Sequence, residues 1–313
     1  MHSSFHFAFA SLLACCVCGA TAQEKWPSGG PLPRAPANST ASTRADSARL
    51  AELEKPGELL FSDDFESAAS LEKYFEIRGR DEGRAKLVED VELAHRGRGA
   101  MQFDAPANDG KSSGSGASGW LGAKGHERVH FRRYIRFDAD YDQGNLNHTG
   151  GGLTAVTGND KWRAMGSAGI KPSGDDHFSC AFEPWCDWGR VAKPGYLFFY
   201  VYWMDMERDR DGHFWGNMLG PEVAERFVPE RGRWYCLEQM VKANSPGKAD
   251  GELAAWIDGK LYLHYTGLRL RSDAAVLVKR FDFGIYVHQA TRSNRVWYDD
   301  VALSTGYIGP IAD

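Results

Sequence analysis

The stretch Val129-His-Phe-Arg-Arg-Tyr-Ile-Arg-Phe137 alternates apolar and polar side chains. In an extended chain, successive side chains point to opposite faces, so the apolar members share one face. That face holds Val129, Phe131, Ile135 and Phe137, with Arg133 as its single polar member. The period of two predicts a β-strand with one side in a core, and antiparallel sheets commonly contain such strands.

Short runs of the same kind recur along the chain between clusters of Gly, Asp and Asn. The predicted strands are Glu58–Phe61, Gly99–Phe103, Val129–Phe137, Tyr196–Trp203, Trp234–Lys242, Leu253–Ile257, Leu261–Tyr265, Phe281–His288 and Val296–Ser304. Asp258-Gly259 between two of them is typical of a hairpin turn. Long amphipathic stretches are scarce, so the sequence predicts an all-β fold in which two antiparallel sheets form a sandwich or jelly roll.

The amino-terminal residues predict export. An apolar run from Phe5 to Val17 is followed by the small-x-small pattern of residues 20–22, which is typical of a signal peptide over residues 1–22. We therefore expect a secreted or periplasmic protein, with lipoprotein processing at Cys15 as the less favoured alternative. No later run has the ~18 apolar residues that a membrane-spanning helix requires.

Composition then divides the rest of the chain. Residues 23–56 are rich in Pro, Ala, Ser and Thr, which predicts a disordered linker, and residues 57–313 are expected to form one domain. Residues 108–119 are small and polar and are expected to form a surface loop. Cys180 and Cys186 are close in sequence and are the predicted disulfide, while Cys236 in a strand-like run is a predicted buried thiol.

Three parts of the chain resemble one group of proteins. They are Phe61-Ser-Asp-Asp-Phe-Glu66, then Trp234-Tyr-Cys-Leu-Glu-Gln-Met-Val-Lys-Ala-Asn244 with Gly251-Glu-Leu-Ala-Ala-Trp-Ile-Asp-Gly259, and Val296-Trp-Tyr-Asp-Asp-Val-Ala-Leu-Ser304 with Tyr307-Ile-Gly-Pro310. These are similar to concanavalin A-like jelly-roll proteins of polysaccharide lyase type, including glucuronan- and alginate-lyase-like families. The resemblance covers roughly residues 58–310 and implies a sugar groove on a concave sheet. The same sandwich also serves lectins and glycoside hydrolases.

Strand alternation predicts which side chains face that groove. The polar face of the Val129–Phe137 strand carries His130, Arg132, Tyr134 and Arg136. Its cations suit a polymer of carboxylates or sulfates, although an ordinary solvated face is the alternative. Other strands are expected to contribute Tyr200, Tyr202, Tyr286, His288 and the adjoining Gln289. Of these, Tyr286 loosely matches the strand that carries the catalytic tyrosine in alginate-lyase sandwiches.

A uronate-cleaving β-elimination needs a group that neutralises the carboxylate, a base for the C5 proton and an acid for the leaving O4. Arginine or histidine can neutralise the carboxylate, and tyrosine or histidine can move the protons. His148, in a Gly-rich segment where a ligand can approach the backbone, is the preferred assistant. The predicted catalytic residues are therefore Tyr200, Tyr202, His148, Arg132 and Tyr286. The alternative for the tyrosines is packing or stacking on sugar rings, and the alternative for His148 is an ordinary histidine of a surface loop.

Further side chains have two open interpretations each. Glu238 and Lys242 share a predicted face and either brace the sheet as an ion pair or contribute to binding the uronate. Trp185 and Trp188 are predicted to form a groove wall that stacks on sugar rings. The resemblance implies paired terminal strands, so Asp64 and Glu66 with Asp299 or Asp300 are a predicted structural calcium site. Solvated carboxylates are the alternative.

The sequence thus predicts a secreted lyase for a uronic-acid polysaccharide that requires no cofactor for its chemistry. A non-catalytic carbohydrate-binding sandwich is the second hypothesis. A glycoside hydrolase is the third, ranked lower because no strand has the Glu-x-Asp-x-Glu spacing of paired carboxylates. The net charge of -5, with both signs interspersed, gives no case for nucleic acid as a partner.

Overall fold

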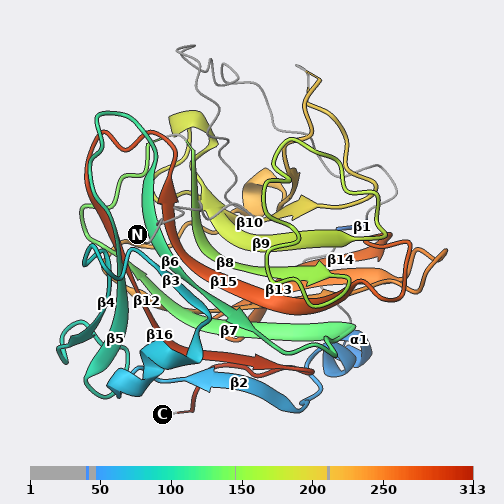
Figure 1. Ribbon diagram of the computed structural model, residues 1–313, viewed down its shortest axis with the longest axis horizontal. Helices are drawn as coiled ribbons and strands as arrows, with labels where there is room; N and C mark the ends of the chain where they lie inside the picture. Colours follow the sequence, from blue (N-terminus) through green and yellow to red (C-terminus); the bar gives the residue numbers. More distant parts are fainter. Residues whose placement is uncertain (1–39, 42–46, 145, 210–211, 313) are drawn as a thin grey trace, which may run out of the picture.

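The computed structural model describes residues 40–41, 47–144, 146–209 and 212–312. Two antiparallel sheets pack face to face around one core, which confirms the predicted β-sandwich jelly roll (Figure 1). The predicted signal peptide and lipoprotein site, and most of the predicted linker, lie outside the described residues. No helix in these described ranges is long and apolar enough to cross a membrane.

Within the described residues, one sheet has seven strands. Their spatial order is β11 (Asn217–Leu219), β10 (Tyr196–Tyr202), β9 (His177–Trp185), β8 (Asn147–Val156), β15 (Leu277–Val287), β6 (Ser113–Trp120) and β3 (Glu76–Arg78). At alternate positions of β10 and β15 the apolar side chains are at most 1% exposed, as the alternation predicted: Leu197, Phe199, Val201, Phe281, Phe283 and Ile285. The intervening residues therefore lie on the outer face of this sheet.

The other sheet has nine strands in the part of the chain that the structure describes. Their order is β1 (Thr40–Ala41), β14 (Lys260–Leu268), β13 (Gly251–Ile257), β12 (Trp234–Lys242), β7 (Arg128–Phe137), β16 (Asn294–Ser304), β5 (Gly99–Ala105) and β4 (Ala85–Glu89), with β2 (Leu59–Asp63) paired to β16. The pairing of β2 with β16 joins the first and last long strands of the domain, as the resemblance implied.

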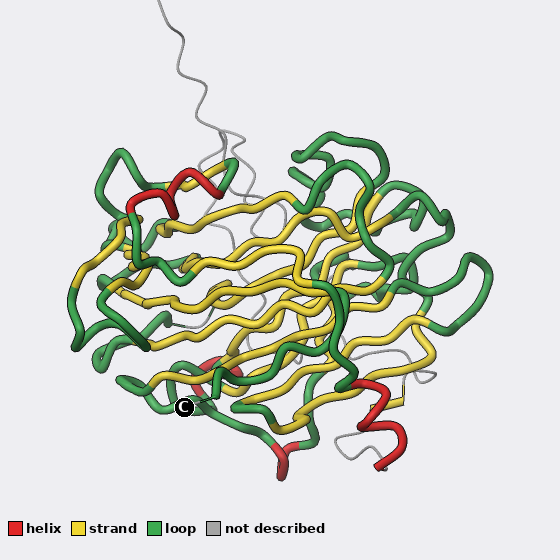
Figure 2. Tube along the Cα trace, turned by 90° about the horizontal axis from the view of Figure 1, so that it is seen from below, coloured by secondary structure: helices red, strands yellow, loops and turns green. Residues whose placement is uncertain are grey.

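Helices are short and lie at the margins of the sheets (Figure 2). They are α1 (Ser47–Leu53) and the 3-10 turns η1 (Ala68–Lys73), η2 (Asp187–Gly189) and η3 (Val223–Glu225). Leu53 of α1 packs with Met240, Ala254 and Trp256 on the outer face of the nine-stranded sheet. The folded unit therefore begins before residue 57, where the sequence placed its boundary.

The expected loop of residues 108–119 is wrong for most of its length, because Ser113–Trp120 form strand β6 between β15 and β3. Small residues have low strand propensity, but packing overrides it here. A Cβ added at Gly119 would lie 2.0 Å from the Phe281 ring, and one at Gly114 would lie 2.3 Å from the Ile285 carbonyl oxygen. The small side chains are thus required by close approach inside the sheet.

The predicted disulfide is also wrong. Cys180, Cys186 and Cys236 are all buried, and no disulfide joins any two of these described cysteines. The residues from 177 to 185 form an extended strand rather than a loop, so six residues at about 3.3 Å each place Cys180 roughly 20 Å from Cys186. A disulfide requires Cα atoms within about 7 Å. Cys236 is a buried thiol, as predicted.

Two core side chains of the nine-stranded sheet support the middle of the seven-stranded one. The Tyr298 hydroxyl lies 2.9 Å from the Gly150 carbonyl oxygen and 2.7 Å from that of Gly284. Gly150 and Gly284 are register partners on β8 and β15. Arg133, fully buried as the exception on its strand, donates to the Phe182 carbonyl oxygen at 2.6 Å. Side chains of the nine-stranded sheet therefore hydrogen-bond, from the core side, to the backbone at the centre of the seven-stranded sheet.

Candidate active site

The outer face of the seven-stranded sheet gathers titratable side chains from three strands. His148 of β8 lies beside Tyr200 of β10, with ring centroids 5.1 Å apart, and beside His288 at 5.2 Å. Tyr286 of β15 lies 6.4 Å from the His148 ring and 5.0 Å from that of His288. We call these four residues and Glu183 the histidine–tyrosine cluster. The structure thus brings together three predicted catalytic residues and predicted His288.

Glu183 completes the cluster from β9. Its Oε1 lies 2.8 Å from Nδ1 of His148. Its side chain is only 4% exposed, while that of His148 keeps 13% of its surface exposed. Residues from β8, β9, β10 and β15 meet here because these four strands are neighbours in the sheet.

Strand register sets this geometry. Tyr286 lies directly opposite His148, and Phe198 lies opposite Glu183. Gly150 follows two residues after His148 on the same face and has φ +153°. A Cβ there would meet the Phe182 carbonyl oxygen at 2.6 Å and the Glu183 Cβ at 3.3 Å. Glycine at this position therefore leaves room for Glu183 to reach His148.

The two tyrosines of β10 keep their protons at neutral pH. Burial raises the pKa of Tyr200 well above its ordinary value, and Tyr202 adds to the effect. Burial also raises the pKa of Tyr202. The Tyr200 hydroxyl accepts a hydrogen bond from the Gly216 N–H at 2.9 Å. These tyrosines are suited to donating a proton rather than to acting as phenolate bases.

Cationic and neutral groups border the cluster. The Arg78 guanidinium of β3 lies 5.7 Å from the Tyr286 ring centroid. Burial lowers the pKa of Arg78 to about 10, so it remains charged at neutral pH. Burial, followed by the neighbouring His148, holds the pKa of His288 well below its ordinary value, so His288 is neutral there. Arg78 thus places a positive charge beside the cluster at neutral pH.

Aromatic side chains adjoin the cluster. Trp185 at the end of β9 lies opposite Tyr196, and their ring centroids are 6.0 Å apart. Trp188 lies 6.1 Å from Trp185 in an edge-on arrangement. Both predicted tryptophans therefore lie beside one another near the outer face of the seven-stranded sheet. Gln289, which was predicted together with Tyr286 and His288, is exposed just beyond β15.

The expected placement of four side chains of β7 is wrong. This strand belongs to the nine-stranded sheet, between β12 and β16, so its polar face points away from both the core and the cluster. The residues concerned are His130, Arg132, Tyr134 and Arg136. Each contacts nearby chain instead: Arg132 donates to the Gly309 and Asp300 carbonyl oxygens, and Arg136 to that of Glu92. Periodicity indicates a face of a strand but not its sheet.

Glu238 and Lys242 lie on this same outer face of the nine-stranded sheet, and they do not pair with each other. Glu238 binds His130 Nδ1 at 2.8 Å and accepts hydrogen bonds from the Ile308 and Gly309 N–H groups. Lys242 binds Glu252 at 2.9 Å. Both residues brace the carboxy-terminal segment or neighbouring strands, far from the cluster in the fold.

A cavity of about 290 Å³ lies beside α1 on that face. Glu252 in its lining is bonded to Lys242, Arg49 and His264. Burial opposes ionisation of Glu252, but these three hydrogen bonds outweigh it and hold its pKa below the ordinary value. The charge of Glu252 is therefore paired within the chain.

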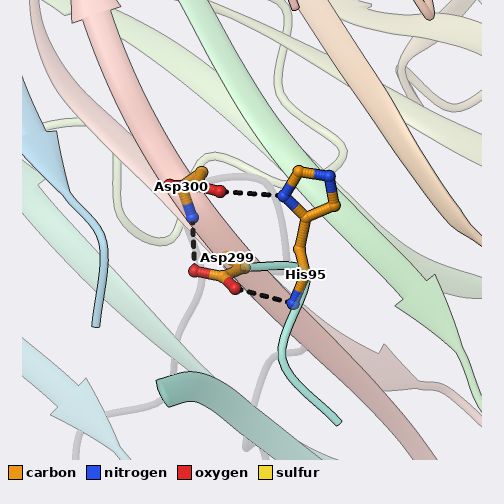
Figure 3. Close-up of side chains that lie close together, drawn as sticks. All are labelled: His95, Asp299 and Asp300. Atoms are coloured by element: carbon orange, nitrogen blue, oxygen red, sulfur yellow. Dashed lines mark hydrogen bonds and ion pairs between the residues drawn. The ribbon is translucent and has the colours of Figure 1, made fainter. Parts of the chain in front are cut away.

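The predicted calcium ligands do not assemble as expected. Asp299 groups instead with Asp300 and His95, whose ligand atoms lie within 4.8 Å of one another (Figure 3). The Asp299 carboxylate accepts the His95 N–H at 2.8 Å, and His95 Nδ1 lies 2.8 Å from Asp300. Glu66 accepts the Arg98 and Gly99 N–H groups, and Asp64 that of Glu66. Each of these carboxylates thus takes part in hydrogen bonds with the chain itself.

Sequence reasoning missed Glu183 and Arg78. The alternation of residues 177–185 contained the signal for Glu183, because Phe178, Cys180 and Phe182 are apolar and leave Glu183 on the opposite face. Reading this segment as a disulfide loop hid that pattern. Arg78 lies in a three-residue strand, which is too short to show a period.

No protein-family model and no curated protein matches the chain. Solved structures do match it. The PL-14 alginate lyase from Aplysia kurodai aligns with a TM-score of 0.58 at 16% identity, over 82% of this chain and 100% of that one. A mutant of alginate lyase Aly36B in complex with alginate tetrasaccharide gives 0.54 at 16% identity, over 83% and 98%.

The endo-beta-1,4-glucuronan lyase from the fungus Trichoderma reesei gives a TM-score of 0.53 at 17% identity, over 78% of this chain and 94% of that one. At such identities the similarity establishes a shared fold. The resemblance to the jelly roll of polysaccharide lyases is therefore confirmed as a resemblance of architecture.

Proposed function

We propose that this protein is a secreted polysaccharide lyase that cleaves a uronic-acid polysaccharide by β-elimination. The observation that carries the proposal is the histidine–tyrosine cluster on the outer face of the seven-stranded sheet. It joins a histidine whose ring is partly exposed with neutral, proton-carrying Tyr200 and with Tyr286 beside Arg78. The export signal in the sequence supports secretion.

Each step of the elimination has a side chain to perform it. Arg78, with neutral His288 as a hydrogen-bond donor, pairs with the uronate carboxylate and makes the C5 proton more acidic. His148 Nε2 removes that proton, and the electron pair forms the double bond between C4 and C5 while the bond from C4 to O4 breaks. A flanking tyrosine, Tyr286 or Tyr200, donates its proton to O4. The proposed reaction needs no cofactor.

The substrate follows from charge and from the relatives. Arg78 and the histidines suit a polymer with carboxylates, and the half-buried Trp188 offers a flat ring for a sugar, with the buried Trp185 packed beside it. The names of the matching structures refer to alginate and glucuronan, which makes these two polymers the first candidates.

The test is a panel of uronic-acid polysaccharides incubated with the mature protein. We expect a new ultraviolet absorbance from unsaturated uronate ends. Replacing Tyr286 or Tyr200 with Phe, one at a time, identifies the acid, because removing its hydroxyl lowers kcat by about 10²- to 10⁴-fold.

Two results contradict the proposal. New reducing ends without the absorbance indicate hydrolysis. Retention on the polysaccharide without cleavage indicates a carbohydrate-binding sandwich.

A further inference from the structure

We propose that Glu183 is a positioning residue that fixes the tautomer of His148, so that Nε2 faces the substrate as a base. This inference deepens the proposed function and rests on it for its kinetic consequences. It does not need that function for its structural consequence, because the tautomer of an imidazole can be measured in the free protein.

The hydrogen bond between Glu183 and His148 uses only one nitrogen of the imidazole ring. Glu183 Oε1 lies 2.8 Å from His148 Nδ1, which is a normal distance for a charge-assisted hydrogen bond. A carboxylate accepts hydrogen bonds and does not donate them, so the proton of neutral His148 lies on Nδ1. Among the described residues, no group hydrogen-bonds to His148 Nε2. Its lone pair is therefore left for a substrate proton.

Glu183 also stabilises the product of proton removal. When Nε2 takes a proton, the imidazolium is positive and lies beside a carboxylate in a site of low exposure. The attraction between opposite charges is strong where little water screens it. In the serine protease triad an aspartate acts in the same two ways on its histidine.

Other titratable groups around His148 do not replace this contact. Tyr200 faces it from β10 and Tyr286 from β15, and His288 faces it from just beyond β15. Arg78 lies beyond Tyr286, and Arg133 lies beneath the sheet, under Gly151. Of these groups, Glu183 alone contributes a negative charge at neutral pH.

The experiment replaces Glu183 with Gln and with Asp. Gln keeps the shape but can accept or donate, so it no longer dictates which nitrogen of His148 carries the proton. For Glu183→Gln we expect kcat to fall by about 10²- to 10⁴-fold, with a much smaller change in KM. The acidic limb of the kcat–pH profile moves to lower pH, because the imidazolium loses its negative neighbour. Glu183→Asp restores part of kcat and the position of that limb.

Nitrogen NMR of the His148 imidazole gives the second measurement. In the wild type we expect signals of a protonated Nδ1 and an unprotonated Nε2 at a pH where the ring is neutral, and a tautomer mixture in Glu183→Gln. The matched control is Glu252→Gln, which changes another buried carboxylate that contacts a histidine, His264, at 2.9 Å. It leaves kcat, the pH profile and the His148 signals unchanged.

The outcomes separate the two proposals. If the wild type forms no unsaturated product from any polymer but the NMR result holds, the proposed function fails and the tautomer assignment stands. If the wild type is active and Glu183→Gln keeps its kcat, its pH profile and a single Nδ1–H tautomer, the role of Glu183 is refuted. A loss of kcat that Glu252→Gln matches points to general destabilisation and also refutes it.

Discussion

Two histidine–glutamate pairs of almost the same geometry lie on opposite outer faces of the sandwich. His148 and Glu183 bridge β8 and β9 of one sheet, and His130 and Glu238 bridge β7 and β12 of the other. In both, Nδ1 lies 2.8 Å from a carboxylate oxygen. The difference lies at the second nitrogen: Arg128 donates to His130 Nε2 at 3.2 Å, whereas no described group bonds to that of His148.

Burial separates the pairs further. The His130 side chain is fully buried, and Glu238 also accepts the Ile308 and Gly309 N–H groups from the carboxy-terminal segment. Burial is the main reason that the pKa of His130 is lowered. A pair whose every polar atom is satisfied within the chain holds the fold together, whereas one with an open nitrogen can react. Chemical identity alone does not distinguish a structural pair from a functional one.

The largest expected effect comes from replacing the two histidines with Gln. His148→Gln lowers kcat by about 10²- to 10⁴-fold, because it removes the base. His130→Gln leaves kcat of the folded protein unchanged and lowers the free energy of unfolding by about 1–3 kcal/mol, because buried polar atoms of Glu238 and Arg128 lose their partner. Kinetics and denaturant unfolding of both variants measure this. If His130→Gln lost as much kcat as His148→Gln, the two histidine–glutamate pairs would not differ as structural and reactive pairs.

A smaller effect is expected from the core residue that supports the reactive side. Tyr298→Phe leaves the Gly150 and Gly284 carbonyl oxygens without their shared hydroxyl. We expect a loss of about 1–3 kcal/mol in the free energy of unfolding and a fall in kcat smaller than that of His148→Gln. Urea unfolding and steady-state rates test this, and unchanged stability would show that the carbonyl oxygens find other partners.

The smallest expected effect is a pH-dependent loss of stability on the nine-stranded side, when Glu252 is replaced with Gln. Hydrogen bonds from His264, Lys242 and Arg49 lower the folded-state pKa of Glu252 below its unfolded value of about 4.3. A lowered pKa contributes stability above that unfolded value, and the contribution is lost as pH falls through the folded value. Glu252→Gln should therefore be less stable than the wild type at pH 7, with the gap closing in acid. A stability difference between the two proteins that did not change with pH would contradict the lowered pKa of Glu252 as its cause.

The sequence predicted the class of fold because alternation records directly which face of a strand is buried. It could not predict which sheet a strand joins, since that depends on pairing between distant residues. The polar face of β7 was therefore wrongly assigned to the sugar groove. Strand β6 was missed because its small residues are required by contacts with Phe281 and Ile285, which only the folded chain creates. His148, Tyr200 and Tyr286 were found as types suited to proton transfer, but their shared partner Glu183 was not.

The central claim is that the cluster around His148 breaks the polymer by elimination rather than by adding water. Mass spectrometry of products formed in oxygen-18 water tests it most directly, with alginate and glucuronan as substrates. Elimination predicts one unsaturated end and one new reducing end for each bond broken, with no solvent oxygen in either product. We expect His148→Gln to lose both kinds of end together. Saturated products with one solvent oxygen added for each bond cleaved would contradict the account.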